Sequence, residues 1–122
     1  ADFRPLAVAD QKMKKQDGNE QLTLTLVKNP DIIKAVSALL PRPFTVGFAA
    51  ETENVLGHAR DKLKRKNLDA IIANDVAIEG TGFNSDDNAV TLISPKFEQN
   101  FDRRSKNQLA RDLINAISKI MA

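Results

Sequence analysis

The sequence predicts an α/β domain, and three of its segments carry this prediction. Residues 44–50 and 69–74 are short apolar runs on either side of a helical pattern at residues 52–66. A strand, a helix and a strand within about 30 residues predict a βαβ unit with two parallel strands. Strict Leu/Thr alternation at residues 21–26 indicates a half-buried strand, and the periodicity of residues 105–121 indicates an amphipathic helix.

The first quarter of the chain predicts a β-hairpin followed by a helix. Residues 11–16 alternate like residues 21–26, and residues 17–20, Asp-Gly-Asn-Glu, supply turn chemistry between them. We therefore expect a hairpin over about residues 11–28. The segment Asn29-Pro30-Asp31 is typical of a helix start, and Pro41 would end that helix.

Further signals divide the remainder of the chain. Thr52 is a candidate cap for the helix at residues 52–66, whose last turns carry many basic side chains. Residues 80–88 indicate a loop that contains only a weak glycine motif, and residues 89–93 a third strand. Ser105 and Gln108 fit a capping box. The apolar stripe of the helix behind it consists of Leu109, Leu113, Ile114, Ile117, Ile120 and Met121.

Length, charge and composition exclude several classes of protein. The chain has 122 residues, the size of one ordinary domain, and 18 basic against 16 acidic side chains. This near balance argues against a protein that coats nucleic acid by charge alone, although residues 1–66 carry 12 basic and only 8 acidic side chains. The absence of cysteine excludes disulfides and thiolate chemistry and suits a reducing cytosol. The sequence has no apolar run long enough to predict a membrane span. It does not start with Met, which suggests a segment of a longer protein.

Two groups of basic side chains are candidates for binding a phosphate-bearing ligand. Lys12, Lys14 and Lys15 lie beside the predicted turn, where they could reach over a polyphosphate or merely protect an edge strand from aggregation. His58, Lys62 and Lys66 follow one another at i,i+4 steps on one helical face. A shared anion would relieve their mutual repulsion, but a solvated helix face fits the same pattern.

Two further segments could contact other parts of such a ligand. The helix start at Asn29-Pro30-Asp31 offers free N–H groups, although the pattern also fits an ordinary helix cap. Phe48 precedes the carboxyl end of a predicted strand, the edge at which open α/β sheets bind ligands. Its ring could cover a flat base or belong to the core. With a single histidine, no Ser/His/Asp triad can be argued.

Seven segments together resemble a known enzyme family. They are Asp-Phe-Arg-Pro at residues 2–5, Lys-Met-Lys-Lys at 12–15, and the stretches at 26–32, 46–52, 66–69, 73–76 and 82–86. In this order the set resembles the carboxyl-terminal portion of phosphopantothenate–cysteine ligase, which bacteria commonly fuse to a flavin-dependent decarboxylase. The resemblance implies a three-layer Rossmann-like or ribokinase-like sheet with a protruding hairpin flap. It also implies that residues 1–122 are the carboxyl-terminal part of one CTP-binding ligase domain.

The resemblance implies an activity in coenzyme A biosynthesis. CTP and Mg²⁺ would activate 4′-phosphopantothenate as an acyl-cytidylate, which cysteine then attacks. Lys12 would be the catalytic lysine that contacts the phosphates, with Lys14 and Lys15 as supporting charges of the flap. The remaining residues implied to bind CTP are Asp2, Pro30, Asp31, Ile32, Ile33, Phe48, Lys62 and Lys66. FMN would belong only to the fused decarboxylase, and no residue of this chain is assigned as a metal ligand.

The family pattern also includes parts that this sequence does not contain. The upstream half of the ligase domain, with a glycine-rich phosphate loop and a catalytic asparagine, would be needed for full activity. The resemblance further implies a homodimer, for which the strand with Leu22, Leu24 and Leu26 is a plausible pairing surface, and a cytoplasmic enzyme. The alternatives are a nucleic-acid-binding module that uses residues 12–15 and 60–66, a dimerisation domain without a ligand, and a relative that uses ATP.

Overall fold

The computed structural model describes residues 2–14, 18 and 20–122. The chain divides into two compact parts, residues 1–32 and residues 33–122, which are described separately. The element order is β1 (Phe3–Pro5), β2 (Leu26–Lys28), α1 (Ile32–Ser37), β3 (Val46–Glu51), α2 (Val55–Arg65), β4 (Ala70–Asp75), β5 (Asp87–Ile93), β6 (Glu98–Ser105) and α3 (Lys106–Met121).

The first part contains a two-stranded antiparallel ribbon. β1 pairs with β2, with Phe3 opposite Lys28, and the Leu6 N–H extends the ribbon by donating to the Thr25 carbonyl at 2.9 Å. The prediction that residues 11–16 pair as a strand with residues 21–26 is wrong for the described residues, which have strand structure only at Leu26. The side chains of Leu22, Leu24 and Leu26 are all exposed, so the Leu/Thr alternation does not mark a half-buried strand here.

The second part is built on a four-stranded sheet in the order β3-β4-β5-β6. β3 and β4 are parallel, as the βαβ pattern predicts, whereas β5 and β6 are antiparallel to their neighbours. The predicted third strand exists and begins two residues early, at Asp87. β6, at Glu98–Ser105, is a strand that the sequence did not predict.

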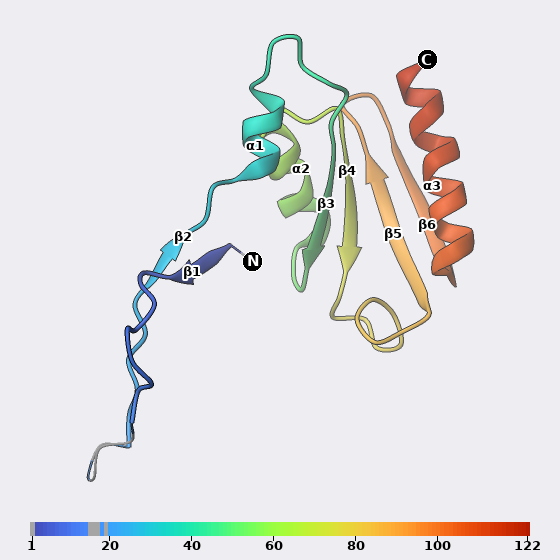
Figure 1. Ribbon diagram of the computed structural model, residues 1–122. Coiled ribbons are helices and arrows are strands. Elements are labelled where there is room, and N and C mark those ends of the chain that lie inside the picture. The colour runs from blue at the N-terminus through green and yellow to red at the C-terminus, as the bar shows by residue number, and fades with distance from the viewer. Residues whose placement is uncertain (1, 15–17, 19) are drawn as a thin grey trace. The chain divides into compact units, whose positions relative to one another are not determined.

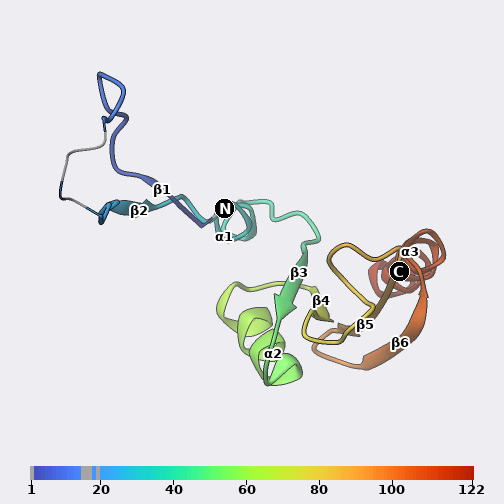
Figure 2. The ribbon, with the colours of Figure 1, turned by 90° about the horizontal axis from the view of Figure 1, so that it is seen from below.

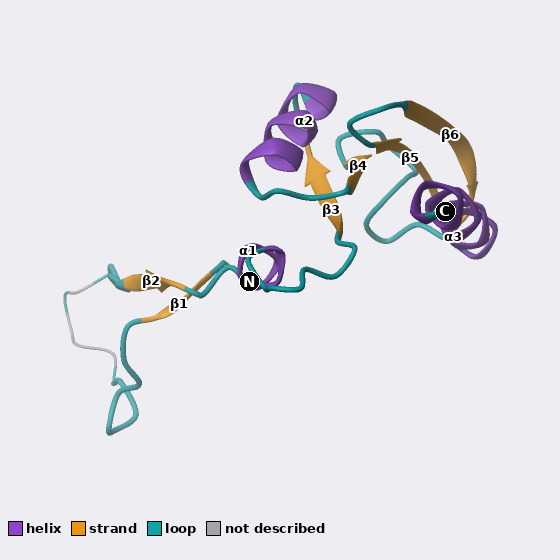
Figure 3. Cartoon of the chain, turned by 90° about the horizontal axis from the view of Figure 1, so that it is seen from above, coloured by secondary structure: helices purple, strands orange, loops and turns teal. Residues whose placement is uncertain are grey.

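Helices cover both faces of this sheet, which makes the second part three layers thick (Figures 1, 2 and 3). Alternate residues of β4 divide between two apolar clusters: Ala70 and Ile72 pack with α3, and Ile71 and Ala73 pack with α2. The α/β prediction is therefore confirmed. Among the described residues, none of the helices combines the length and the apolar character that crossing a membrane requires.

The helix boundaries differ from the predicted ones at three points. α1 begins at Ile32, three residues after the expected Asn29 cap, and ends at Ser37, four residues before Pro41. α2 follows Asn54, which has a left-handed φ of 42° and makes no side-chain cap, so Thr52 does not cap it. In α3, Ser105 accepts a hydrogen bond from the Gln108 N–H, but the Gln108 side chain donates to Asp112 instead of completing the capping box.

The buried stripe of α3 is narrower than predicted. Leu109, Leu113 and Ala116 are buried, while Ile117 and Ile120 are partly buried against the same cluster. Ile114 and Met121 are 66% and 60% exposed, so their assignment to the buried face is wrong. The reason is geometric, since Ile114 follows Leu113 and lies about 100° around the helix from it.

Candidate functional site

The helix face that carries His58 and Lys62 lies against the end of β3. Glu51 is the last residue of β3, and its carboxylate accepts a hydrogen bond from Lys62 Nζ through Oε1. Its other oxygen, Oε2, lies 3.5 Å from His58 Nδ1. The structure thus brings two of the three predicted i,i+4 residues to one carboxylate, at the carboxyl end of a parallel strand. Ligands of open α/β sheets bind at such an edge.

The electrostatics of this cluster favour a negatively charged Glu51 carboxylate paired with Lys62. The hydrogen bond from Lys62 lowers the pKa of Glu51, outweighing the opposite effect of burial, and the nearby His58 lowers it further. Glu51 is therefore ionised at neutral pH. Lys66 lies one turn beyond Lys62, where its backbone N–H caps α2 by donating to the carbonyls of Lys62 and Lys64.

Phe48 lies in the middle of β3 and is 61% exposed, so it is not a core residue. It faces the side of the sheet away from α2, because the residues that flank it, Gly47 and Ala49, face the α2 side. The neighbouring Gly47 has a packing role: a Cβ atom there would lie 2.7 Å from the Leu68 side chain. An exposed aromatic ring on an edge strand leaves a flat apolar surface for a ligand.

In the first part of the chain, the structure brings Asp2 next to the predicted helix start. The Asp2 carbonyl accepts a hydrogen bond from the Asn29 N–H at 2.8 Å, and Arg4 donates to Asn29 Oδ1 at 3.0 Å. Asp2 therefore neighbours the stretch that begins at Pro30 and Asp31. Ile32 is 77% exposed, whereas Ile33 packs against the α2 cluster of the second part.

The predicted flap lysines are only partly described. Lys12 and Lys14 are exposed, and Lys15 lies outside the described residues. Asp2, Lys12, Pro30, Asp31 and Ile32 belong to the first part, and Ile33, Phe48, Lys62 and Lys66 to the second. The predicted site therefore consists of two separate groups of residues, each of which has its own local geometry.

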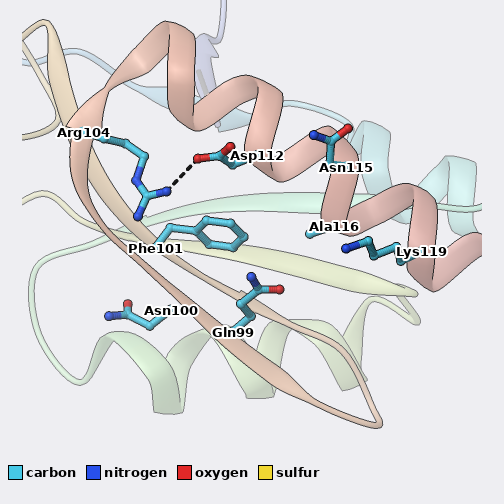
Figure 4. Close-up of a pocket in the computed structure, with 8 residues that line it drawn as sticks. All are labelled: Gln99, Asn100, Phe101, Arg104, Asp112, Asn115, Ala116 and Lys119. Atoms are coloured by element: carbon cyan, nitrogen blue, oxygen red, sulfur yellow. Dashed lines mark hydrogen bonds and ion pairs between the residues drawn. The ribbon is translucent and has the colours of Figure 1, made fainter.

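Sequence reasoning missed Glu51 and a polar cavity on the far side of the sheet. Glu51 stands eleven residues before Lys62 and lies in a strand instead of the helix, so only the packing of α2 on β3 reveals the pair. The cavity, of about 350 Å³, lies between β6 and α3 and is lined by Gln99, Asn100, Phe101, Arg104, Asp112, Asn115, Ala116 and Lys119 (Figure 4). Arg104 is engaged there by Asp112 at 2.6 Å.

A metal site made by the chain alone finds no support in the described ranges. In residues 2–14, 18 and 20–122, no group of three or more histidine or carboxylate side chains comes together as a metal site would require. Two carboxylates at the carboxyl ends of β3 and β4 accept hydrogen bonds within the chain: Glu51 from Lys62, and Asp75 from the Ala77 N–H.

Curated relatives match almost the whole chain. It is 51% identical over 122 residues to a protein of Vibrio vulnificus named coenzyme A biosynthesis bifunctional protein CoaBC, covering 99% of this chain and 30% of that protein. The protein of the same name from Escherichia coli is 47% identical over 119 residues, covering 96% and 29%. The chain thus spans about 30% of the length of these relatives.

Solved structures and a family model give the same result. The C-terminal domain of a CoaBC bifunctional protein superposes with a TM-score of 0.73 at 27% identity, covering 99% of this chain and 50% of that one. A flavoprotein from Streptococcus pneumoniae, at 22% identity and a TM-score of 0.70, shares the fold. The sequence model of the DNA/pantothenate metabolism flavoprotein C-terminal domain matches residues 1–121, and the chain belongs to this family.

Proposed function

We propose that this chain is the nucleotide-binding part of a CTP-dependent ligase that joins 4′-phosphopantothenate to cysteine in coenzyme A biosynthesis. The observation that carries the proposal is Lys62, an α2 lysine that donates to Glu51 at the carboxyl end of β3. The name of the relatives supports the pathway, since they are called coenzyme A biosynthesis bifunctional proteins.

The proposed reaction has two steps. A carboxylate oxygen of 4′-phosphopantothenate attacks the α-phosphorus of CTP, and the bond to the β-phosphate oxygen breaks to release pyrophosphate. The amine of cysteine then attacks the acyl carbon of the acyl-cytidylate, and CMP leaves as the amide forms. Catalysis of this kind depends on positioning the two substrates and on neutralising charge on the leaving groups.

The chain's own residues have binding roles in this proposal. Lys62 and Lys66 contact phosphate oxygens from the second part, and Lys12 contacts them from the first as the catalytic lysine. Lys14 and Lys15 add positive charge to the flap. Phe48 offers its exposed ring to the cytosine base, and Asp2 accepts from the ribose. The backbone of residues 30–33 lines the nucleotide.

Mg²⁺ enters the proposal with the nucleotide. It prefers oxygen ligands and is commonly bound through substrate phosphates with few protein carboxylates. FMN is assigned to a fused decarboxylase and not to this chain, which has no role in flavin chemistry under the proposal.

The proposal includes a second copy of the chain and the rest of the ligase domain as partners. Leu22, Leu24 and Leu26 are 69%, 59% and 52% exposed, which leaves an apolar strip on the first part. Such a strip is unusual on a monomer and is commonly buried in an interface. Sedimentation of the full-length protein tests the homodimer, and a monomer at micromolar concentration would refute it.

The test of the nucleotide site is substitution of Lys62 in the full-length protein. We expect Lys62→Ala to weaken Mg-CTP binding by about tenfold or more, because a hydrogen-bonded charge contact to phosphate is lost. Isothermal titration calorimetry measures the affinity. Lys64→Ala is the matched control, since Lys64 lies on the same helix, is exposed and is two residues from Lys62. Equal affinity in the wild type and Lys62→Ala would contradict the assignment.

The nucleic-acid alternative is not supported by the comparisons. Two of the arginines in its basic stretch on α2 also lie near acidic side chains: Arg60 pairs with Glu98, and Arg65 lies 4.0 Å from Asp61. Pairing with acidic side chains reduces the number of cations that could displace counterions from a nucleic-acid backbone.

A further inference from the structure

The carboxylate of Glu51 stands between two side chains of α2. Lys62 Nζ donates to Oε1, and His58 Nδ1 lies 3.5 Å from Oε2, so each oxygen faces a different partner. Glu51 is the most buried of the three side chains, at 15% exposure against 33% for Lys62 and 46% for His58. The carboxylate is therefore the least exposed group of the cluster, and both of its partners are more accessible to solvent.

The fold holds Glu51 in place through the backbone of β3. Alternation along the strand places Gly47, Ala49 and Glu51 on the α2 side of the sheet. The Glu51 carbonyl accepts a hydrogen bond from the Val76 N–H at 3.0 Å, which ties the end of β3 to the residue after β4. Side chains on a helix lean towards its N-terminus, so Lys62 extends along α2 towards this end of the strand.

The pair differs from the other ion pairs of α2. The Arg60–Glu98 side chains are 50% and 37% exposed, and the Arg65–Asp61 side chains are 64% and 73% exposed at 4.0 Å. Such exposed pairs restrain their partners little. Lys62 is less exposed than either arginine, and its ammonium has three N–H donors, of which the bond to Glu51 uses one. Two donors are left to turn towards a phosphate.

Resting on the proposed function, we propose that Glu51 is a positioning residue for the nucleotide site, which fixes the Lys62 ammonium at the carboxyl end of β3 for contact with a phosphate of the nucleotide. A lysine side chain has four rotatable bonds and loses substantial rotamer entropy when it is immobilised. Because Glu51 immobilises Lys62 before the nucleotide arrives, this loss of rotamer entropy does not weaken nucleotide binding.

The test is Glu51→Gln in the full-length protein, with KM and kcat measured for each substrate. The substitution keeps the size of the side chain and removes the charge that holds Lys62. We expect KM for Mg-CTP to rise about fivefold, since the lysine must then be ordered on binding. We expect kcat to stay within about twofold and KM for cysteine to stay unchanged, because under this proposal Glu51 acts only through Lys62.

Two further variants separate positioning from a general structural role. Glu51→Asp keeps the charge and is expected to restore part of the affinity that Glu51→Gln loses. Glu98→Gln is the matched control, because Glu98 also pairs with an α2 cation, Arg60, and is expected to leave KM for Mg-CTP unchanged. In a Lys62→Ala background, Glu51→Gln is expected to have no further effect on KM, since it acts through Lys62.

The outcomes distinguish this inference from the proposed function. An unchanged or lower KM for Mg-CTP in Glu51→Gln, or an effect that persists in the Lys62→Ala background, overturns the role of Glu51. If Lys62→Ala weakens Mg-CTP binding while Glu51→Gln does not, only this inference fails. If Lys62→Ala itself has no effect, the nucleotide site proposed above is wrong, and the role of Glu51 is overturned with it.

Discussion

At the scale of single residues, the Asp69 carboxylate, directly before β4, accepts three hydrogen bonds. Arg42 donates to both of its oxygens, at 2.8 and 2.6 Å, and the Thr45 N–H donates to Oδ2 at 2.7 Å. Burial would raise the pKa of Asp69, but these hydrogen bonds outweigh it and hold the pKa below its ordinary value. The side chain thereby joins the loop before β3 to the start of β4.

We predict that Asp69→Asn destabilises the folded chain by about 2 kcal/mol, the usual worth of a hydrogen bond to a charged group. Because the folded-state pKa is lowered, the stabilisation by Asp69 is present above its ordinary pKa. It is lost as the pH falls through the lowered value, below about pH 4. Urea unfolding at several pH values measures both effects. The variant should lack this part of the acid sensitivity.

The control for this prediction is Asp61→Asn. Asp61 is 73% exposed and lies 4.0 Å from Arg65, so its removal should change the free energy of unfolding by less than about 0.5 kcal/mol. If Asp61→Asn and Asp69→Asn destabilise the protein equally, the hydrogen bonds of Asp69 have no special role in stability.

At the scale of the elements, the long C-terminal helix depends on its cap. Ser105 ends β6 and accepts from the Gln108 N–H, so one residue both terminates the strand and starts α3. The Lys106 N–H donates to the Asp86 carbonyl at 2.9 Å, which ties the same corner to the residue before β5. These two hydrogen bonds fix where α3 begins, with its buried face over β5 and β6.

We predict that Ser105→Ala lowers the free energy of unfolding by about 1 kcal/mol, because one N–H of the first turn loses its acceptor. Thermal or urea unfolding measures the change. Ser118→Ala is the matched control, since the Ser118 hydroxyl is exposed and donates only to the Asn115 carbonyl within the helix. A loss of similar size in both variants would show that capping is not the cause.

Much of the second part was predictable from local patterns, whereas β6 was not. The apolar runs of β3 and β4 and the period of α2 and α3 reflect burial, which sequence periodicity records directly. β6 is an edge strand in which only Phe101 is buried, so its sequence, Glu-Gln-Asn-Phe-Asp-Arg-Arg-Ser, shows no apolar alternation. Its charged side chains suit an exposed edge and conceal the strand.

The candidate site also contains both residues that a local sequence pattern indicates and a residue that only the packing of two elements reveals. The i,i+4 spacing of His58 and Lys62 was visible in the sequence, because helix geometry is local. Glu51 was not visible as their partner, because its contact requires α2 to pack on β3. Strand pairing was expected for residues 11–16, but the described part of this range, residues 11–14, forms no strand. Alternation does not fix which residues of two arms pair.

At the scale of the whole molecule, the residues proposed to bind the nucleotide are distributed over both compact parts of the chain. Asp2, Lys12 and residues 30–32 belong to the first part, while Phe48, Lys62 and Lys66 belong to the second. The chain also spans only about 30% of the length of its curated relatives. We therefore assign the full activity to the complete protein and expect this chain alone to lack it.

The measurement that tests the proposed function most directly is turnover by the full-length protein with CTP, 4′-phosphopantothenate and cysteine. We predict a product with a new amide bond, and release of one pyrophosphate and one CMP for each product formed. Replacing CTP with ATP should reduce the rate. No CTP-dependent product, or release of CDP and phosphate instead, would contradict the proposal.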